Sequence, residues 1–276
     1  MMLEDKTAVI YGGGGAIGGA VARAFAAAGA RVHLAGRSRA RLEAVAGDIG
    51  DAARVAELDA LDERAVVAHA DAVAAEAGGI DIALNAVSFP YAQGMLLGGL
   101  SVADVMHPID AFLRSNLITA QATARHMTAR GSGAILTLST AGARFARPGN
   151  LGFGTTCAAI EQMTQRLAAE LGPSGVRVVC LRPTAIADAP ANGSFTGEVF
   201  APLAAASGVS VEQMLAQWGE DQTLLGRLPT LAQVADAAVF LASDRAGAIT
   251  GAVTDLTSGN AVRAQQYGQA LIGVLD

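Results

Sequence analysis

The chain has 276 residues, of which 52% are hydrophobic and 16% charged, and its formal net charge is −6 at pH 7. This length fits one large α/β domain, and the composition argues against intrinsic disorder. The chain is acidic and has no run of Lys or Arg, so we expect no nucleic-acid partner.

The charge pattern and the cysteine spacing indicate the cellular compartment of the protein. The sequence becomes charged by position 4 without an apolar core, so we expect no cleaved leader. Residues 82–103 carry no charge but include Asn, Ser, Pro, Gln and three Gly, so we expect no membrane span there. Cys157 and Cys180 follow no metal-ligand or disulfide spacing, which fits a reducing compartment. We therefore expect a cytoplasmic protein without a metal site or a membrane partner.

A glycine-rich stretch follows the first apolar run, Ala8–Ile10, which is typical of a short buried strand. Gly13, Gly15 and Gly18 fit the spacing G-x-G-x-x-G. Hydrophobic residues then recur at helical spacing, at Ile17, Val21, Ala24, Phe25 and Ala28. A strand, a glycine turn and a helix N-terminus together form an anion site for a pyrophosphate. A plain tight turn or a glycine-rich hairpin is the alternative, but the β/α alternation that follows favours the nucleotide site.

A second strand is predicted at Arg31–Ala35, and Gly36, Arg37 and Ser38 follow it. In a dinucleotide-binding fold this strand end meets the adenosine ribose, where an acid accepts from the 2′-hydroxyl and an Arg suits a 2′-phosphate. Arg37, with Ser38 beside it, therefore favours NADP(H) over NAD(H). The alternative is a solvated basic loop that leads into a helix at residues 41–46.

Strands and helices continue to alternate after this loop. The hydrophobic pattern predicts strands at 54–58, 80–84, 134–138, 176–181 and 252–256. It predicts helices at 62–77, 102–130, 151–172 and 231–242, the second of them broken near His107 and Pro108. No repeat or linker divides the chain, so we expect one domain.

Polar or small residues follow four of these strands, namely Asp59, Asn85, Ser139 and Thr184. The carboxyl ends of parallel strands share one edge of the sheet, and ligands bind at that edge. Residues 188–229 interrupt the alternation with Gly, Pro, Ser and the single Trp. We expect this insertion to be a mobile lid with one or two helices, and Met214 and Trp218 to form its apolar underside.

With these landmarks in place, the chain resembles the short-chain dehydrogenase/reductase family over nearly its whole length. The family's Thr-Gly-x-x-x-Gly-Ile-Gly corresponds to residues 11–18, its Pro-Gly-x-Ile to residues 183–186, and its helix-to-strand passage to residues 168–178. The resemblance implies a single Rossmann-type α/β domain, with a doubly wound parallel sheet and helices on both faces. It implies cofactor contacts at Gly12, Gly14, Gly15, Ile17, Gly18, Arg37, Ser38, Asp59, Ala60, Asn85, Ala86, Pro183 and Ile186.

The family's catalytic Tyr-x-x-x-Lys falls on Phe153 and Cys157. In the family that Tyr protonates the substrate oxygen and the Lys lowers its pKa, whereas Phe has no proton to donate and Cys no fixed positive charge. The spacing from Ser139 to Phe153 is also one residue longer than is usual. An alignment of residues 139–161 with the enoyl-thioester reductases has no gap, and it places the Tyr on Asn150 and the Lys again on Cys157.

The remaining members of the family's catalytic set fall on Ser139 and Asn116. The resemblance implies that Ser139, together with Thr140 and Asn116 or a held water, stabilises negative charge on the substrate oxygen. Alternatively, Ser139 caps its turn and Asn116 bonds a carbonyl of its own helix. Tyr91 follows the Asn85 strand end and is a further side chain that we expect near the pocket mouth.

These observations predict an NADP(H)-dependent oxidoreductase acting on a small apolar carbonyl, enone or enoyl substrate. A non-redox lyase, isomerase or cyclase, or a catalytically silent nucleotide-binding subunit or sensor, is the alternative. The resemblance also implies a homodimer or homotetramer formed through the helix at 151–172. The apolar face proposed for this contact consists of Ala158, Ala159, Ile160 and Met163.

Overall fold

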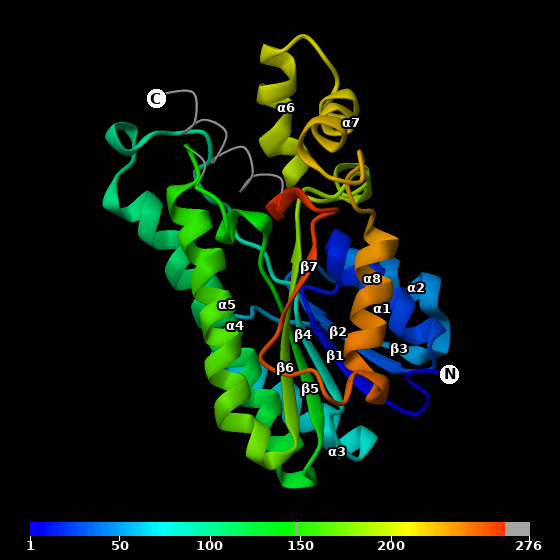
Figure 1. The fold of residues 1–276 in the computed structure, drawn as a ribbon. Coiled ribbons are helices and arrows are strands. Elements are labelled where there is room, and N and C mark those ends of the chain that lie inside the picture. The colour runs from blue at the N-terminus through cyan, green and yellow to red at the C-terminus, as the bar shows by residue number, and fades with distance from the viewer. Residues whose placement is uncertain (147, 263–276) are drawn as a thin grey trace.

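A seven-stranded parallel sheet runs through the computed structural model, which describes residues 1–146 and 148–262 (Figure 1). The strand order is β3-β2-β1-β4-β5-β6-β7. The strands are β1 (Thr7–Tyr11), β2 (Arg31–Gly36), β3 (Ala53–Glu57), β4 (Ile82–Asn85), β5 (Gly133–Leu138), β6 (Val176–Pro183) and β7 (Val253–Leu256). Because the order reverses between β1 and β4, a crevice opens there at the carboxyl ends of the strands. The predicted doubly wound sheet is confirmed.

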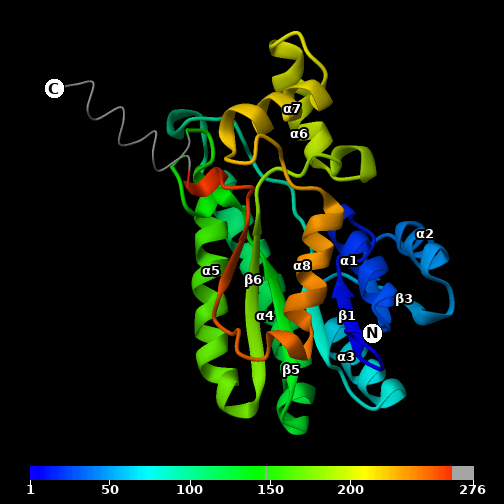
Figure 2. The same ribbon diagram turned by 45° about the vertical axis from the view of Figure 1, so that its right-hand side comes forward.

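Helices cover both faces of the sheet (Figures 1 and 2). One layer consists of α1 (Ala16–Ala27), α2 (Arg39–Ile49) and α8 (Leu231–Ala242), and the other of α3 (Glu63–Ala77), α4 (Val102–Arg130) and α5 (Leu151–Leu171). Each layer has its own apolar core. Phe25 and Leu42 pack into the first, and Val66, Ile118 and Ala168 pack into the second. Val21 and Phe25, two of the positions at helical spacing in the sequence, are among those that attach α1 to the sheet.

The helix break predicted near His107 and Pro108 is wrong, because α4 runs unbroken through both residues. A capping box at Ser101 and Asp104 starts this helix, with each side chain accepting from the other residue's backbone N–H. Pro108 is buried, and a Cβ added to Gly152 of α5 would lie 3.2 Å from its ring. Packing against α5 thus offsets the one helical hydrogen bond that a proline removes.

Helix α2 is longer than the predicted 41–46 and begins directly after Ser38. Helix α5 matches its predicted range, but part of the proposed dimer face does not hold. Ile160 is only 1% exposed and packs with Phe112 and Cys180 in the protein's own core, so it is not available to a second subunit. Ala158 is exposed on the same helix. Self-association as a homodimer or homotetramer stays a prediction.

The insertion after β6 contains two helices, α6 (Thr196–Ala206) and α7 (Val211–Gln222), which lie beyond the carboxyl end of the sheet in both ribbon views (Figures 1 and 2). Its apolar residues pack on one another. Met214 is buried with Phe200, and the ring of Trp218 meets that of Phe200 edge-on at 5.4 Å. The expectation that Met214 and Trp218 form the underside of a lid is therefore wrong, because they form the core between the two helices.

Within the described ranges, no single helix is long and apolar enough to cross a membrane. Helices α6 and α7 reach the necessary length and hydropathy only when taken together, across a bend of 85°. The same part of the chain holds no group of three or more His, Cys, Asp or Glu side chains arranged to bind a metal ion.

Candidate active site

The glycine loop is held against the ends of two neighbouring strands. Gly12 and Gly13 both donate to the carbonyl oxygen of Ala35, at 2.8 and 3.1 Å. Gly12 has φ +81°, and a Cβ there would lie 2.5 Å from the carbonyl oxygen of Ala86. At Gly18 a Cβ would lie 2.2 Å from the carbonyl oxygen of Gly12. The close packing of this turn therefore requires glycine at both positions.

Helix α1 begins immediately after this turn. Its N-cap is Gly15, which has no side chain to accept from the first helical N–H groups, and its first turn carries no acid. These N–H groups and the helix dipole favour an anion. Ile17 and Ile186, both predicted cofactor contacts, meet in one apolar cluster beside the helix start. The turn and the helix start therefore fit the pyrophosphate of a dinucleotide.

Basic residues surround the end of β2. Arg37 and Ser38 are exposed, and Arg39 is paired with Glu43 at 2.7 Å. The backbone and Cβ of Arg41 pack on the glycine loop, since a Cβ added to Gly14 would lie 2.9 Å from the Arg41 Cβ. Neither Arg37 nor Arg41 forms an ion pair with any residue that the structure describes. Arg41 was not singled out from the sequence, although it follows Arg37 by four residues.

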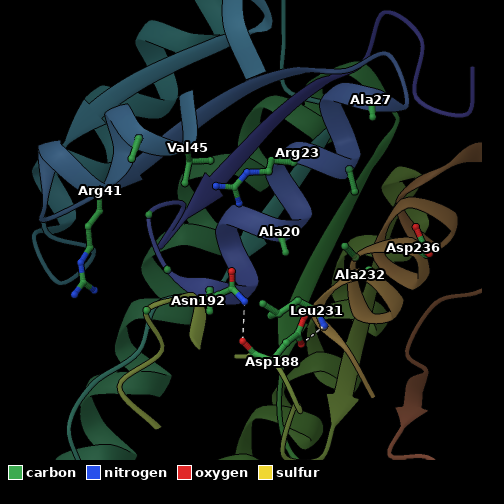
Figure 3. Close-up of a pocket in the computed structure, with 17 residues that line it drawn as sticks. Ala20, Arg23, Ala27, Arg41, Val45, Asp188, Asn192, Leu231, Ala232 and Asp236 are labelled. Atoms are coloured by element: carbon green, nitrogen blue, oxygen red, sulfur yellow. Dashed lines mark hydrogen bonds between the residues drawn. The ribbon is translucent and has the colours of Figure 1, made fainter. Parts of the chain in front are cut away.

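Figure 3 shows a groove of about 630 Å³ that starts at the glycine loop and continues along α1. Gly14 and Gly15 line its near end, and much of the rest is formed by alanines of α1 and α8. Asp188 forms part of its wall, where the carboxylate accepts from the N–H of Leu231 at 2.9 Å. Of the predicted cofactor residues only these two glycines line it, so this groove is not the crevice at the carboxyl edge.

The polar side chains at the ends of β3 and β4 already have hydrogen-bond partners within the protein. Asp59 accepts from the N–H of Leu61 at 3.0 Å. Asn85 is buried, donates to the Thr119 hydroxyl at 3.0 Å and accepts from the N–H of Val87 at 3.1 Å. These bonds fix the strand end beside the glycine loop. Ala60 and Ala86, also predicted as cofactor contacts, follow β3 and β4, and Pro183 is the last residue of β6.

Ser139 is hydrogen-bonded to a buried ion pair. Its hydroxyl donates to Glu161 Oε1 at 2.7 Å. The guanidinium of Arg182 donates to both oxygens of the same carboxylate, at 2.6 and 2.7 Å, and this bond raises the pKa of Arg182. The Ser139 hydroxyl therefore already donates its hydrogen bond to a carboxylate. The sequence analysis missed this ion pair, whose two members are 21 residues apart on α5 and β6.

The next residue, Thr140, has its hydroxyl on the side of Cys157. Its Oγ1 lies 3.5 Å from the Cys157 Sγ and accepts from the N–H of Gly142 at 3.2 Å. Cys157 is 1% exposed, and burial raises the pKa of its thiol to about 11. The thiol thus stays protonated at neutral pH and is not a reactive thiolate. Of the two neighbouring hydroxyls, that of Thr140 is the one beside Cys157.

Four other aromatic rings gather around Phe153. We call Phe89, Tyr91, Phe112, Phe153 and Phe195 the aromatic cluster. Tyr91 stacks on Phe153 with ring centroids 3.9 Å apart and an interplanar angle of 3°. Phe195 meets Tyr91 edge-on at 5.6 Å, Phe112 lies 5.8 Å from Phe153, and Phe89 lies 5.1 Å from Phe112. These rings come from the loop after β4, from α4 and α5, and from the insertion, so they meet over the carboxyl edge of the sheet.

Asn116 lies on α4 and is buried. Its Nδ2 donates to the carbonyl oxygen of Phe112 at 2.9 Å, whereas its Oδ1 has no partner among residues 1–146 and 148–262. Leaving a buried acceptor unpaired costs about 1–3 kcal/mol. Asn116 is therefore bonded to its own helix, as the alternative interpretation expected, but it keeps one acceptor for a water or a bound molecule.

Comparisons with known proteins agree with this geometry. A family model described as Enoyl-(Acyl carrier protein) reductase matches residues 14–260. The chain is 30% identical to the D-threitol dehydrogenase of Mycolicibacterium smegmatis, over 95% of both chains. It is 32% identical to a solved short chain dehydrogenase/reductase family protein, over 95% of this chain and 100% of the other, with a TM-score of 0.77. A 3-ketoacyl-(acyl-carrier-protein) reductase from Brucella melitensis, complexed with NADH, is 27% identical with a TM-score of 0.79, over 94% and 99% of the two chains.

Proposed function

The chain belongs to the short-chain dehydrogenase/reductase family of oxidoreductases, and from this premise we propose that it is an NADP(H)-dependent reductase of a small apolar ketone, enone or enoyl compound. The glycine loop carries the proposal, because a Cβ at Gly12 or Gly18 would collide with backbone atoms of the turn. A turn of this kind before a helix N-terminus suits a pyrophosphate. When bound, the nicotinamide cofactor supplies a hydride.

Arg37 and Ser38 support the preference for NADP(H), since no acid occupies the end of β2. The change Arg37→Ala should weaken NADPH binding about 10- to 100-fold, because a charge-assisted bond contributes about 1.5–3 kcal/mol. Arg37→Asp should weaken it at least as much while sparing or improving NADH binding. Fluorescence titration with both cofactors measures this effect. Arg39→Ala is the matched control, because Arg39 is paired with Glu43. Equal affinity of the unmodified protein for NADPH and NADH would contradict the preference.

In the reduction, Thr140 takes the role that the sequence analysis gave to Ser139. Its hydroxyl lies beside Cys157, and counting from Thr140 removes the extra residue in the spacing to Phe153. We assign it the hydrogen bond to the substrate oxygen, where negative charge develops. The free Oδ1 of Asn116 suits a water at the same edge. Cys157, buried and protonated, supplies neither a positive charge nor a nucleophile.

The aromatic cluster supports an apolar substrate, because ligand pockets are lined mainly by apolar and aromatic side chains with a few placed polar groups. Phe195 belongs to the insertion and packs on Tyr91. We therefore assign residues 188–229 a covering role over this edge. Both cysteines are buried and free, which supports a reducing compartment such as the cytoplasm.

Phe153 and Cys157 also favour a second candidate, a non-redox lyase, isomerase or cyclase, because neither residue replaces the proton donor and cation of the family. An assay of NADPH oxidation over ketones, enones and enoyl thioesters, with products identified by mass, separates the functions. One NADPH consumed per product supports the reductase. Conversion without loss of NADPH supports the second candidate. Tight NADPH binding without any conversion would indicate a silent subunit or sensor.

A further inference from the structure

A reduction at this site needs a proton for the substrate oxygen, and few side chains around Phe153 can provide one. Phe153 has no acidic proton, and a threonine hydroxyl is a very weak acid. Cys157 is 1% exposed and its hydrogen-bonding neighbour is Thr140, so its thiol is enclosed. Among the side chains in the aromatic cluster, Tyr91 alone carries an O–H group.

Tyr91 is held in one orientation by its neighbours. The face of its ring lies on Phe153 at 3.9 Å, and Phe195 packs edge-on against it at 5.6 Å. Its hydroxyl has no hydrogen-bond partner in the described part of the chain, and its side chain is only partly buried. Orientation by two rings, together with a hydroxyl that bonds none of residues 1–146 and 148–262, suits a donor to a bound molecule.

The other tyrosines differ from Tyr91. Tyr11 is 0% exposed within β1, and its ring lies against His69. It therefore cannot reach a substrate. Tyr267 lies outside the described residues. The sequence contains these three tyrosines and no other, so each can be tested by the same Tyr→Phe change.

We propose that Tyr91 is the catalytic proton donor of the reduction, in place of the missing residue at position 153. This inference rests on the proposed function. As a hydride from NADPH forms a C–H bond at the carbonyl carbon, the C=O π bond breaks and its electron pair moves to oxygen. That oxygen takes the phenol proton of Tyr91, so the carbonyl is reduced to an alcohol and NADPH is oxidised to NADP⁺. The phenolate then regains a proton from water, which reaches the partly exposed side chain.

The surroundings of Tyr91 favour carbonyl reduction over alcohol oxidation. Burial raises the pKa of its phenol well above the usual value, and the nearby Cys157 raises it further. Tyr91 therefore stays protonated across the neutral range, ready to donate, and its phenolate is a minor species there. Reduction should be nearly independent of pH between about 6 and 9. Alcohol oxidation, which needs the phenolate as a base, should be slow and should rise with pH.

The test compares three Tyr→Phe variants with the substrate that the unmodified protein reduces fastest. Tyr91→Phe should lower kcat about 10²- to 10⁴-fold, with the dissociation constant for NADPH unchanged. Tyr11→Phe and Tyr267→Phe should reduce at the unmodified rate. The exchange of Tyr91→Phe with Phe153→Tyr should recover part of the lost rate, because it returns a phenol to the same ring stack. Circular dichroism of each variant checks that the fold is kept.

The experiment distinguishes failure of the Tyr91 assignment from failure of the proposed function. If the unmodified protein consumes NADPH but Tyr91→Phe stays within threefold of its rate, the assignment of Tyr91 is overturned and the proposed function stands. A large loss in Tyr267→Phe instead would move the donor to the C-terminal segment and also overturn it. If the unmodified protein consumes no NADPH with any ketone, enone or enoyl thioester, the proposed function fails, and the role of Tyr91 fails with it.

Discussion

The double variant Phe153→Tyr with Cys157→Lys should reduce ketones about 10²-fold faster than the unmodified protein, or more. A phenol with a raised pKa, such as that of Tyr91, is a slow donor to an alkoxide. A phenol next to an ammonium group is a better one, because the positive charge lowers its pKa. The spacing of Phe153 and Cys157 along α5 already matches the pair that the family uses.

NADPH oxidation with a panel of ketones measures this gain. Phe153→Tyr alone and Cys157→Lys alone are the matched controls, and each should give only a small part of it, because the phenol and the ammonium group act as a unit. Cys157 is 1% exposed, so the melting temperature of each lysine variant is measured alongside. Ketone turnover by the unmodified protein as fast as that of the double variant would contradict the prediction.

Removing one side of the Glu161–Arg182 ion pair should strongly destabilise the protein. The side chains of Glu161 and Arg182 are only 11% and 9% exposed, and the next acid, Asp255, lies 3.5 Å from the guanidinium. Glu161→Leu leaves this charge without its two-point partner and leaves the Ser139 hydroxyl without its acceptor. We expect the free energy of unfolding to fall by about 3–5 kcal/mol, which is typical of a broken buried pair.

The charge of Arg182 can be removed together with that of Glu161. Glu161→Leu with Arg182→Met replaces the pair by apolar side chains of similar size, and it should recover most of the lost stability. Urea unfolding of the single and double variants gives all the values of this cycle. A single variant within 1 kcal/mol of the unmodified protein would contradict the account of this pair. A double variant no more stable than the single would contradict it as well.

Much of the fold was predictable because it depends on local patterns. Runs such as Ala8–Ile10 and the helical spacing of Val21 and Phe25 report burial residue by residue, and the sheet confirms them. Pro108 predicts a helix break because the hydrogen bond that it removes is a local effect, whereas its packing on α5 is a tertiary one. The predicted cofactor residues meet at one edge because parallel strands share their carboxyl ends.

The candidate site was less predictable because it depends on which partner each hydroxyl meets and on contacts between residues that are far apart in the sequence. Ser139 and Thr140 are neighbours after β5 whose hydroxyls have different partners, Glu161 and Cys157, so one residue of register decides which hydroxyl meets Cys157. The stack of Tyr91 on Phe153 joins a loop after β4 to the first turn of α5. No sequence period connects these two positions. The spacing between Thr140 and Phe153 was the one local signal available.

The transfer of a hydride from NADPH to a substrate carbon is the central claim. The most direct measurement uses NADPH that carries deuterium at C4 on either face of the ring, with product mass and NADPH loss followed together. The account predicts that one of the two labelled cofactors gives a product with a single deuterium on carbon, in a one-to-one ratio with the NADP⁺ formed. A converted product without deuterium from either labelled cofactor, while NADPH stays constant, would contradict it.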